Sequence, residues 1–270
     1  MSKKWLIIVI LLTLTRLNTS VAAENATAEK MTEEAQKLVK KLEGNRFQLG
    51  DIVIDKNNNS IRFPAKVNMS EGVLEVLLSA PHGKLHEALL VTEVDAIHLN
   101  LALIMIGCKA GEMKVKEQGQ DVIPEGTLLK VEIAYKEDKE AKEKIIRAED
   151  WVFDDKQKKA MAQTNWVYTG SFVSDGEYMA QLTGTYIVTF HDPYTIIDIA
   201  LKEGADDTVF WVNKDAVKKK GFPVEIIITA LEKDDEEKTG EEKTDEDKAE
   251  ENKADEDNTD KEKTDENKPE

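Results

Sequence analysis

The side chains best suited to chemistry in this sequence are histidines with acidic neighbours. His82 and His86 stand four residues apart, Glu87 follows directly, and His191 precedes Asp192. Imidazole and carboxylate groups are the usual ligands of zinc in proteins, besides thiolates. Convergence of His82, His86, His191 and Asp192 would therefore make a zinc site. This is one alternative for the chain: a metal-binding protein or a metal-dependent hydrolase.

The local sequence does not favour a helical chelating pair. Pro81 and Gly83 interrupt any helix around His82. Leu90 stands where an H-E-x-x-H motif would need its second histidine. We therefore expect a turn that leads into a strand. On such a ribbon, polar side chains either contact a ligand or hold the turn by hydrogen bonds, and the candidates for this role are Lys84, His86 and Glu87.

Other catalytic patterns are incomplete. Ser171 has no G-x-S-x-G surroundings, and no glycine-rich phosphate loop is followed by Gly-Lys-Ser/Thr. Cys108 is the only cysteine, and it lies in an apolar stretch that favours burial over reactivity. These gaps favour a non-catalytic binding or structural module without a cofactor. The aromatic residues on strand patterns are expected mainly in the core, although a sugar or peptide surface could use them: Trp151, Trp166, Tyr168, Phe172 and Trp211.

The two ends have compositions unlike the rest of the chain. Residues 1–23 combine Lys3 and Lys4 with a ten-residue apolar run and a small-residue site ending at Ala23, which predicts a secretory signal peptide. The alternative is an uncleaved N-terminal anchor. Residues 232–270 hold 20 acidic residues, 8 lysines and no large apolar residue, which predicts a disordered acidic tail. We therefore expect a periplasmic or secreted bacterial protein with no membrane span after signal cleavage.

The formal net charge of −17 also restricts the partners. Nucleic-acid binding needs clustered Lys and Arg side chains that contact phosphates, and no such cluster dominates here. The expected partner is instead an unidentified extracytoplasmic protein or a small ligand.

Hydrophobic periodicity predicts the elements that must position these residues. Helical spacing over residues 27–42 predicts an amphipathic helix within an N-terminal segment, 24–45. From residue 46 to 231 the period changes to two, with strands expected near 61–67, 73–79, 85–91, 128–135, 145–153 and 224–230. Asp95 is expected to cap a short buried helix, and Ser174-Asp175-Gly176 predicts a hairpin. The predicted fold class is α+β: one mainly antiparallel β-sheet domain with a buried short helix and the N-terminal amphipathic helix.

Several strings within this region match a known pattern. They are Gly50–Asp55, Ile61–Asn68, Leu74–Leu78, Gly83–Thr92 and Thr169–Phe172, followed by His191-Asp192-Pro193. Over roughly residues 46–200 the chain resembles the YdjY-like domain family of exported bacterial proteins, and Gly-Lys-x-His-Glu-x-Leu-Leu is the most specific string. The resemblance implies no established activity. A ferredoxin-like role does not transfer, because an iron–sulfur cluster needs about four thiolates and this chain has one cysteine.

Overall fold

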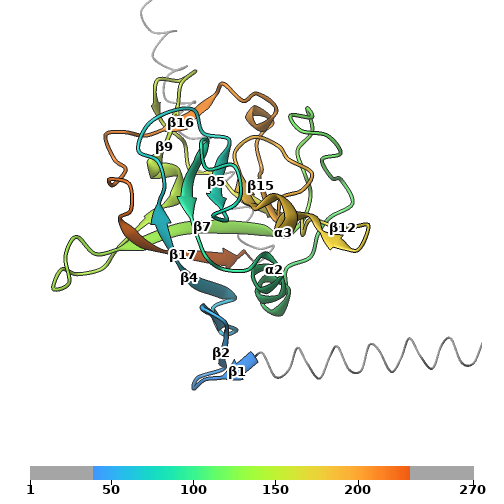
Figure 1. Ribbon diagram of the computed structural model, residues 1–270, viewed down its shortest axis with the longest axis vertical. Helices are drawn as coiled ribbons and strands as arrows, with labels where there is room; N and C mark the ends of the chain where they lie inside the picture. Colours follow the sequence, from blue (N-terminus) through green and yellow to red (C-terminus); the bar gives the residue numbers. More distant parts are fainter. Residues whose placement is uncertain (1–38, 232–270) are drawn as a thin grey trace, which may run out of the picture.

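The computed structural model describes residues 39–231, and its central feature is a ring of eight strands. Consecutive members of the ring are hydrogen-bonded, and the last strand pairs with the first, which closes a barrel (Figure 1). The order around the ring is β4 (Ser60–Val67), β17 (Pro223–Ala230), β7 (Leu128–Tyr135), β11 (Trp166–Tyr168), β15 (Ile197–Ile199), β14 (Thr185–Val188), β5 (Val76–Ser79) and β6 (Ala88–Val91).

The predicted fold class, α+β with one mainly antiparallel β-sheet domain, is wrong, because the sheet closes into a barrel and residues 39–231 include only two short α-helices. Strand β4 is long enough to pair on one side with β3 (Ile52–Asp55) at one end and with β6 at the other. The β4–β6 pairing closes the sheet, and the junctions β5–β6 and β14–β15 are parallel. A strand in a barrel alternates between interior and exterior just as a strand in an open sheet does. Alternation in the sequence therefore does not distinguish the two architectures.

The barrel interior is filled by the alternating apolar residues of its long strands. In β4 these are Ile61, Phe63, Ala65 and Val67, and all are buried. Strands β7 and β17 contribute equivalent sets, Leu129, Val131 and Ile133, and Val224, Ile226 and Ile228. The strands predicted near 61–67, 128–135 and 224–230 are thus confirmed. The strand predicted over 85–91 is shorter than expected, because residues 85–87 form turns and only Ala88–Val91 pairs as β6.

Among the described residues there are two α-helices, α2 (Ala96–Met105) and α3 (Met179–Thr183). Asp95 caps α2, because its Oδ1 accepts hydrogen bonds from the amides of Ile97 and His98 at 2.9 and 3.3 Å. The expectation of a buried helix holds for one face only: Ala96, Leu99, Ala102 and Leu103 are buried, whereas Ile97 and Ile104 are about half exposed. They lie seven residues apart, so they share the helix face that does not pack on the barrel.

The remaining strands extend or flank the barrel. Strands β1 (Val39–Lys41), β2 (Arg46–Leu49) and β3 form an arm beside β4, with β1 and β2 furthest from the barrel (Figure 1). Strand β8 (Lys144–Arg147) pairs with β7, and β10 (Lys159–Ala160), β9 (Val152–Asp154) and β16 (Phe210–Val212) form a separate small sheet. Two 3-10 turns complete the list, η1 (Ala148–Trp151) and η2 (Lys202–Ala205). The predicted strand over 145–153 is therefore three elements: β8, η1 and β9.

Two predictions concern local segments. The hairpin is confirmed: β12 (Val173–Ser174) and β13 (Glu177–Tyr178) are joined by Asp175 and Gly176, both at positive φ, as a type I′ turn requires. The N-terminal amphipathic helix is wrong at its end, since Val39–Lys41 is strand β1. The rest of that helix, the signal peptide and the acidic tail lie outside the described residues. Within residues 39–231, no helix combines the length and apolarity that crossing a bilayer would need.

Candidate functional site

The Gly83–Glu87 string forms turns between β5 and β6, with no α-helix. Lys84 reaches two carboxylates from this turn: its Nζ lies 3.1 Å from Glu87 Oε1 and 3.6 Å from Glu75 Oε2. Although burial lowers it, the hydrogen bond to Glu87 and the nearby negative charges raise the pKa of Lys84 overall. Burial, and then the charge of Glu87, raise the pKa of Glu75. Lys84 therefore joins the start of β5 to the turn before β6.

The other members of the predicted binding and metal sets have separate surroundings. The His86 side chain is 80% exposed, and its Nε2 lies 3.4 Å from Glu87 Oε2. His82 Nε2 lies 2.9 Å from the carbonyl oxygen of Gln181 on α3. His191 is fully buried. No group of three His, Cys, Asp or Glu side chains within residues 39–231 is arranged to hold a metal ion, so the four predicted zinc ligands are not brought together.

His191 pairs with a carboxylate that the sequence did not indicate. Its Nδ1 lies 2.9 Å from Asp198 Oδ1 on β15, and both side chains are completely buried. Burial raises the pKa of Asp198, and the hydrogen bond from His191 partly opposes that effect. The His191 backbone amide also donates to the carbonyl of Gly204 in η2 at 2.7 Å. These contacts fix the start of the 191–195 loop to the barrel.

Asp192 anchors the next step of the same loop. Its Oδ1 accepts a hydrogen bond from the amide of Tyr194 at 2.8 Å. Burial raises the pKa of this carboxyl, and the positive charge of Lys84 lowers it in part. Two residues chosen from the sequence, His191 and Asp192, therefore begin the loop that carries Tyr194, and the charge of Lys84 acts on one of them.

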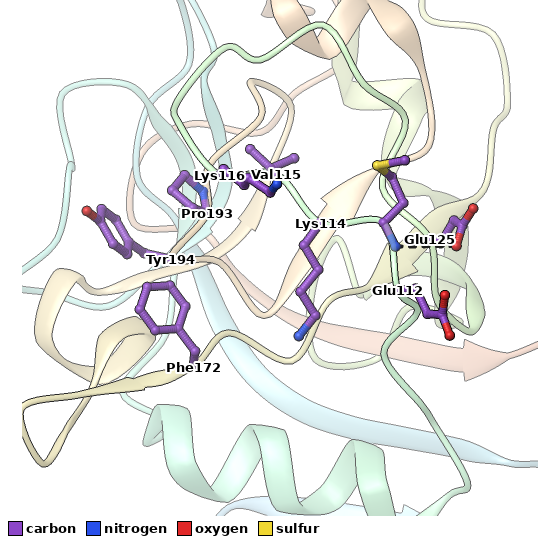
Figure 2. A pocket seen from close by; sticks show the side chains of 9 residues that line it. Glu112, Lys114, Val115, Lys116, Glu125, Phe172, Pro193 and Tyr194 are labelled. Atoms are coloured by element: carbon purple, nitrogen blue, oxygen red, sulfur yellow. Dashed lines mark hydrogen bonds between the residues drawn. The ribbon is translucent and has the colours of Figure 1, made fainter.

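Tyr194 forms one wall of an open cleft of about 720 Å³, which we call the aromatic cleft. Figure 2 shows the rings of Tyr194 and Phe172 side by side, with the Lys114 side chain between them and Glu112 in this view. The two ring centroids are 5.8 Å apart and the planes are tilted by 40°. Phe172 is 43% exposed and Tyr194 is 37% exposed, so both rings are available for contact. The full lining is Glu112, Met113, Lys114, Val115, Lys116, Glu125, Phe172, Pro193 and Tyr194.

Ser171 holds the two rings in this arrangement. Gly170 and Ser171 both have positive φ, which turns the chain sharply after β11. The Ser171 hydroxyl donates to the carbonyl of Tyr194 at 2.7 Å and accepts from the amide of Ala180 in α3 at 3.2 Å. The Ser171 hydroxyl therefore links the backbone just before Phe172 both to the backbone of Tyr194 and to the first turn of α3. Ser171 itself lies in the connection between β11 and β12, outside any strand.

The opposite wall is a loop that doubles back on itself. The Glu125 amide donates to the Met113 carbonyl at 2.9 Å, and Glu125 Oε2 accepts from the Met113 amide at 3.4 Å. This pairing presents the exposed Met113 side chain beside Lys114. The cleft thus combines apolar surface with charged groups of both signs.

Sequence reasoning located the supports of this cleft and missed its contact surface. Phe172 and Trp211 were expected mainly in the core, yet both are more than one-third exposed, whereas Trp151, Trp166 and Tyr168 are buried. Nothing in the local pattern marks Tyr194 or Met113. The one available signal was Gly170 before Ser171, because glycine often marks a turn that ends a strand.

Comparison with known proteins gives one result. The family description "YdjY domain" matches residues 52–229. No curated protein and no solved structure shows a significant match to the chain.

Proposed function

This chain belongs to the YdjY domain family, and we propose that it is an exported bacterial binding module without catalytic activity. In this proposal the aromatic cleft holds a segment of an extracytoplasmic protein. The observation that carries the proposal is the exposed Phe172–Tyr194 ring pair, held by Ser171 and by the buried contacts of the 191–195 loop. Exposed aromatic residues on rigid supports are typical of binding surfaces.

The composition of the cleft favours a polypeptide as its occupant. Phe172 and Tyr194 offer apolar contact on one wall, while the opposite wall combines the apolar Met113 with the charged Lys114 and Glu112. A protein segment carries apolar side chains and charges of both signs, so it complements both walls. A strongly charged small ion of either sign would use only part of this surface.

The buried histidine supports a role without catalysis. A general base must come within hydrogen-bond distance of the proton that it removes. His191 Nε2 has no solvent contact and no partner among the described residues, so a substrate in the aromatic cleft does not reach it. His191 and Asp198 position the loop instead.

Export rests on the sequence. Lys3 and Lys4, the apolar run after them and the small residues up to Ala23 have the order of a secretory signal. A chain with one cysteine has no intrachain disulfide to form outside the cytoplasm, which suits a bacterial periplasm or exterior.

Selection of random dodecapeptides displayed on phage tests the proposed cleft. We expect enriched peptides with aromatic or aliphatic side chains, and about a five- to tenfold loss of affinity in Phe172→Ala or Tyr194→Ala, because central aromatic contacts often contribute more than 1 kcal/mol. Ile145→Ala is the matched control, since Ile145 is a 52% exposed apolar residue on β8 outside the cleft. Equal losses in all three variants, or no enrichment by the unmodified protein, would refute the proposal. Metal analysis of untagged protein separates it from the zinc alternative.

A further inference from the structure

A second cleft lies on the small β10–β9–β16 sheet, away from the residues that line the aromatic cleft. It has a volume of about 590 Å³. We call it the Trp211 pocket, and its lining is Glu71, Gly72, Phe153, Asp155, Trp211, Val212, Asn213, Lys214 and Asp215. None of these residues belongs to the proposed peptide site.

Trp211 is held in a fixed position without being part of the core. In β16 the neighbours Phe210 and Val212 are buried, whereas Trp211 points outward and is 37% exposed. Its indole Nε1 donates to the carbonyl of Thr208 at 3.0 Å, which fixes the ring's edge. Phe153 on β9 is its direct cross-strand neighbour. The pocket therefore has an immobilised aromatic floor.

The charged residues around this floor are mostly acidic. Glu71, Asp155 and Asp215 contribute carboxylates, and Lys214 is the single basic residue in the lining. Asp155 Oδ1 is already 2.7 Å from the ammonium of Lys158, so its charge is partly compensated. The lining still carries net negative charge, which disfavours an anionic ligand.

An aromatic face bordered by carboxylates complements an organic cation. The electron-rich face of an indole attracts a cation placed within about 6 Å of the ring centre, and tryptophan is the strongest such partner. Carboxylates add attraction that a neutral apolar ligand would not use. We propose that the Trp211 pocket binds a ligand through a substituted ammonium group, with the cation over the Trp211 ring and Glu71 and Asp215 at its border.

Choline is the probe for this proposal, and 3,3-dimethylbutan-1-ol is its neutral isostere. Binding of both to the full chain is measured by saturation-transfer NMR titration at constant ionic strength. We expect choline to bind about fivefold or more tightly than the isostere, because cation–π and carboxylate attraction act only on the charged compound. Tryptophan fluorescence should respond to choline, and the response should be lost in Trp211→Phe, since within residues 39–231 Trp211 is exposed whereas Trp151 and Trp166 are buried.

Variants locate the site. Trp211→Ala should weaken choline binding about tenfold, and Trp211→Phe, which keeps a ring, should weaken it less. Glu71→Gln and Asp215→Asn should each weaken it about two- to fivefold, whereas Glu177→Gln, which removes an exposed carboxylate on β13, should leave it unchanged. The proposal would be overturned by equal affinity for choline and the isostere, or by the absence of choline binding. It would also be overturned if the same titration detected binding of glucose and none of choline. Unchanged affinity in the Trp211 variants would overturn it as well.

Discussion

Replacing Gly204 with alanine tests whether the buried His191–Asp198 pair holds the 191–195 loop. A Cβ atom at position 204 would lie 2.5 Å from His191 Cε1 and 2.7 Å from both ring nitrogens. Carbon atoms essentially never approach this closely, so something must move. The ring has no free space, because it is completely buried and its Nδ1 is hydrogen-bonded to Asp198.

The size of the effect follows from this geometry. Forcing an extra methyl group into a packed interior costs typically about 1–3 kcal/mol. Alanine in place of glycine restricts the unfolded chain and returns a fraction of that cost, up to about 1 kcal/mol. We expect a net loss of about 2 kcal/mol in the free energy of unfolding. For a domain of this size that corresponds to a fall of roughly 4–8 °C in Tm.

The assay is a double-mutant cycle with His191→Ala, followed by urea unfolding. In the His191→Ala background the ring is gone, so Gly204→Ala should cost less than about 0.5 kcal/mol. The same destabilisation in both backgrounds would refute the argument, because the cost would then not arise from contact with the imidazole. Peptide binding in the aromatic cleft should weaken in Gly204→Ala if the loop shifts with the ring.

Three further predictions concern buried ionisable groups. Arg147→Met should lower the free energy of unfolding in urea by about 3–5 kcal/mol, because it leaves the fully buried Glu149 carboxylate without its guanidinium partner. The control is Lys130→Met, which breaks the partly exposed pair with Glu132 and should cost less than about 1 kcal/mol. Similar losses in the two variants would count against this reasoning. Burial raises the pKa of Asp192, so the folded state binds its proton more tightly than the unfolded chain does. The wild type should therefore lose stability relative to Asp192→Asn as the pH rises above about 4. A constant difference in unfolding free energy between the two proteins from pH 4 to 8 would contradict this. Burial raises the pKa of Cys108 to about 12. The thiol of the native protein should therefore not react with a disulfide reagent at pH 8, whereas the thiol of the protein unfolded in guanidinium should react fully. Rapid reaction of the native protein would show an accessible thiolate and contradict the prediction.

The long strands were predictable because their residues alternate without interruption. In β4 and β7 every second residue is apolar over eight positions, and the structure buries all of them except Tyr135, which is half-buried. Closure of the ring was not predictable, since it depends on pairing between β4 and β6 through only two residue pairs. Proline is usually confined to edge strands or bulges, yet β4 pairs on both sides, and Pro64 lies between the segments that bind β3 and β6.

The short strands were harder to predict for a related reason. Strands β11 and β15 have three residues each, and all six are buried. A run this short has no measurable period, so its pairing depends on contacts distant in sequence. Asp198 illustrates the consequence: it lies in the middle of β15 as a buried carboxylate, and only the three-dimensional contact with His191 explains why a charged residue occupies that position.

In the candidate site, polar residues anchor the loop and aromatic residues form the exposed contact surface. The histidine, aspartate and lysine side chains attract attention in the sequence, yet His191 and Asp192 bind backbone and neighbouring side chains rather than one another. Their contacts fix the start of a five-residue loop. The Thr195 hydroxyl, which donates to the carbonyl of Tyr186 at 3.0 Å, fixes its end, and the exposed Tyr194 ring lies between. Forming a rigid contact surface on a loop is entropically unfavourable, because fixing the backbone of each residue costs roughly 1–2 kcal/mol. Buried anchors on either side of Tyr194 offset that cost, which explains why the loop is tied to strand β15 by a fully buried ionisable pair.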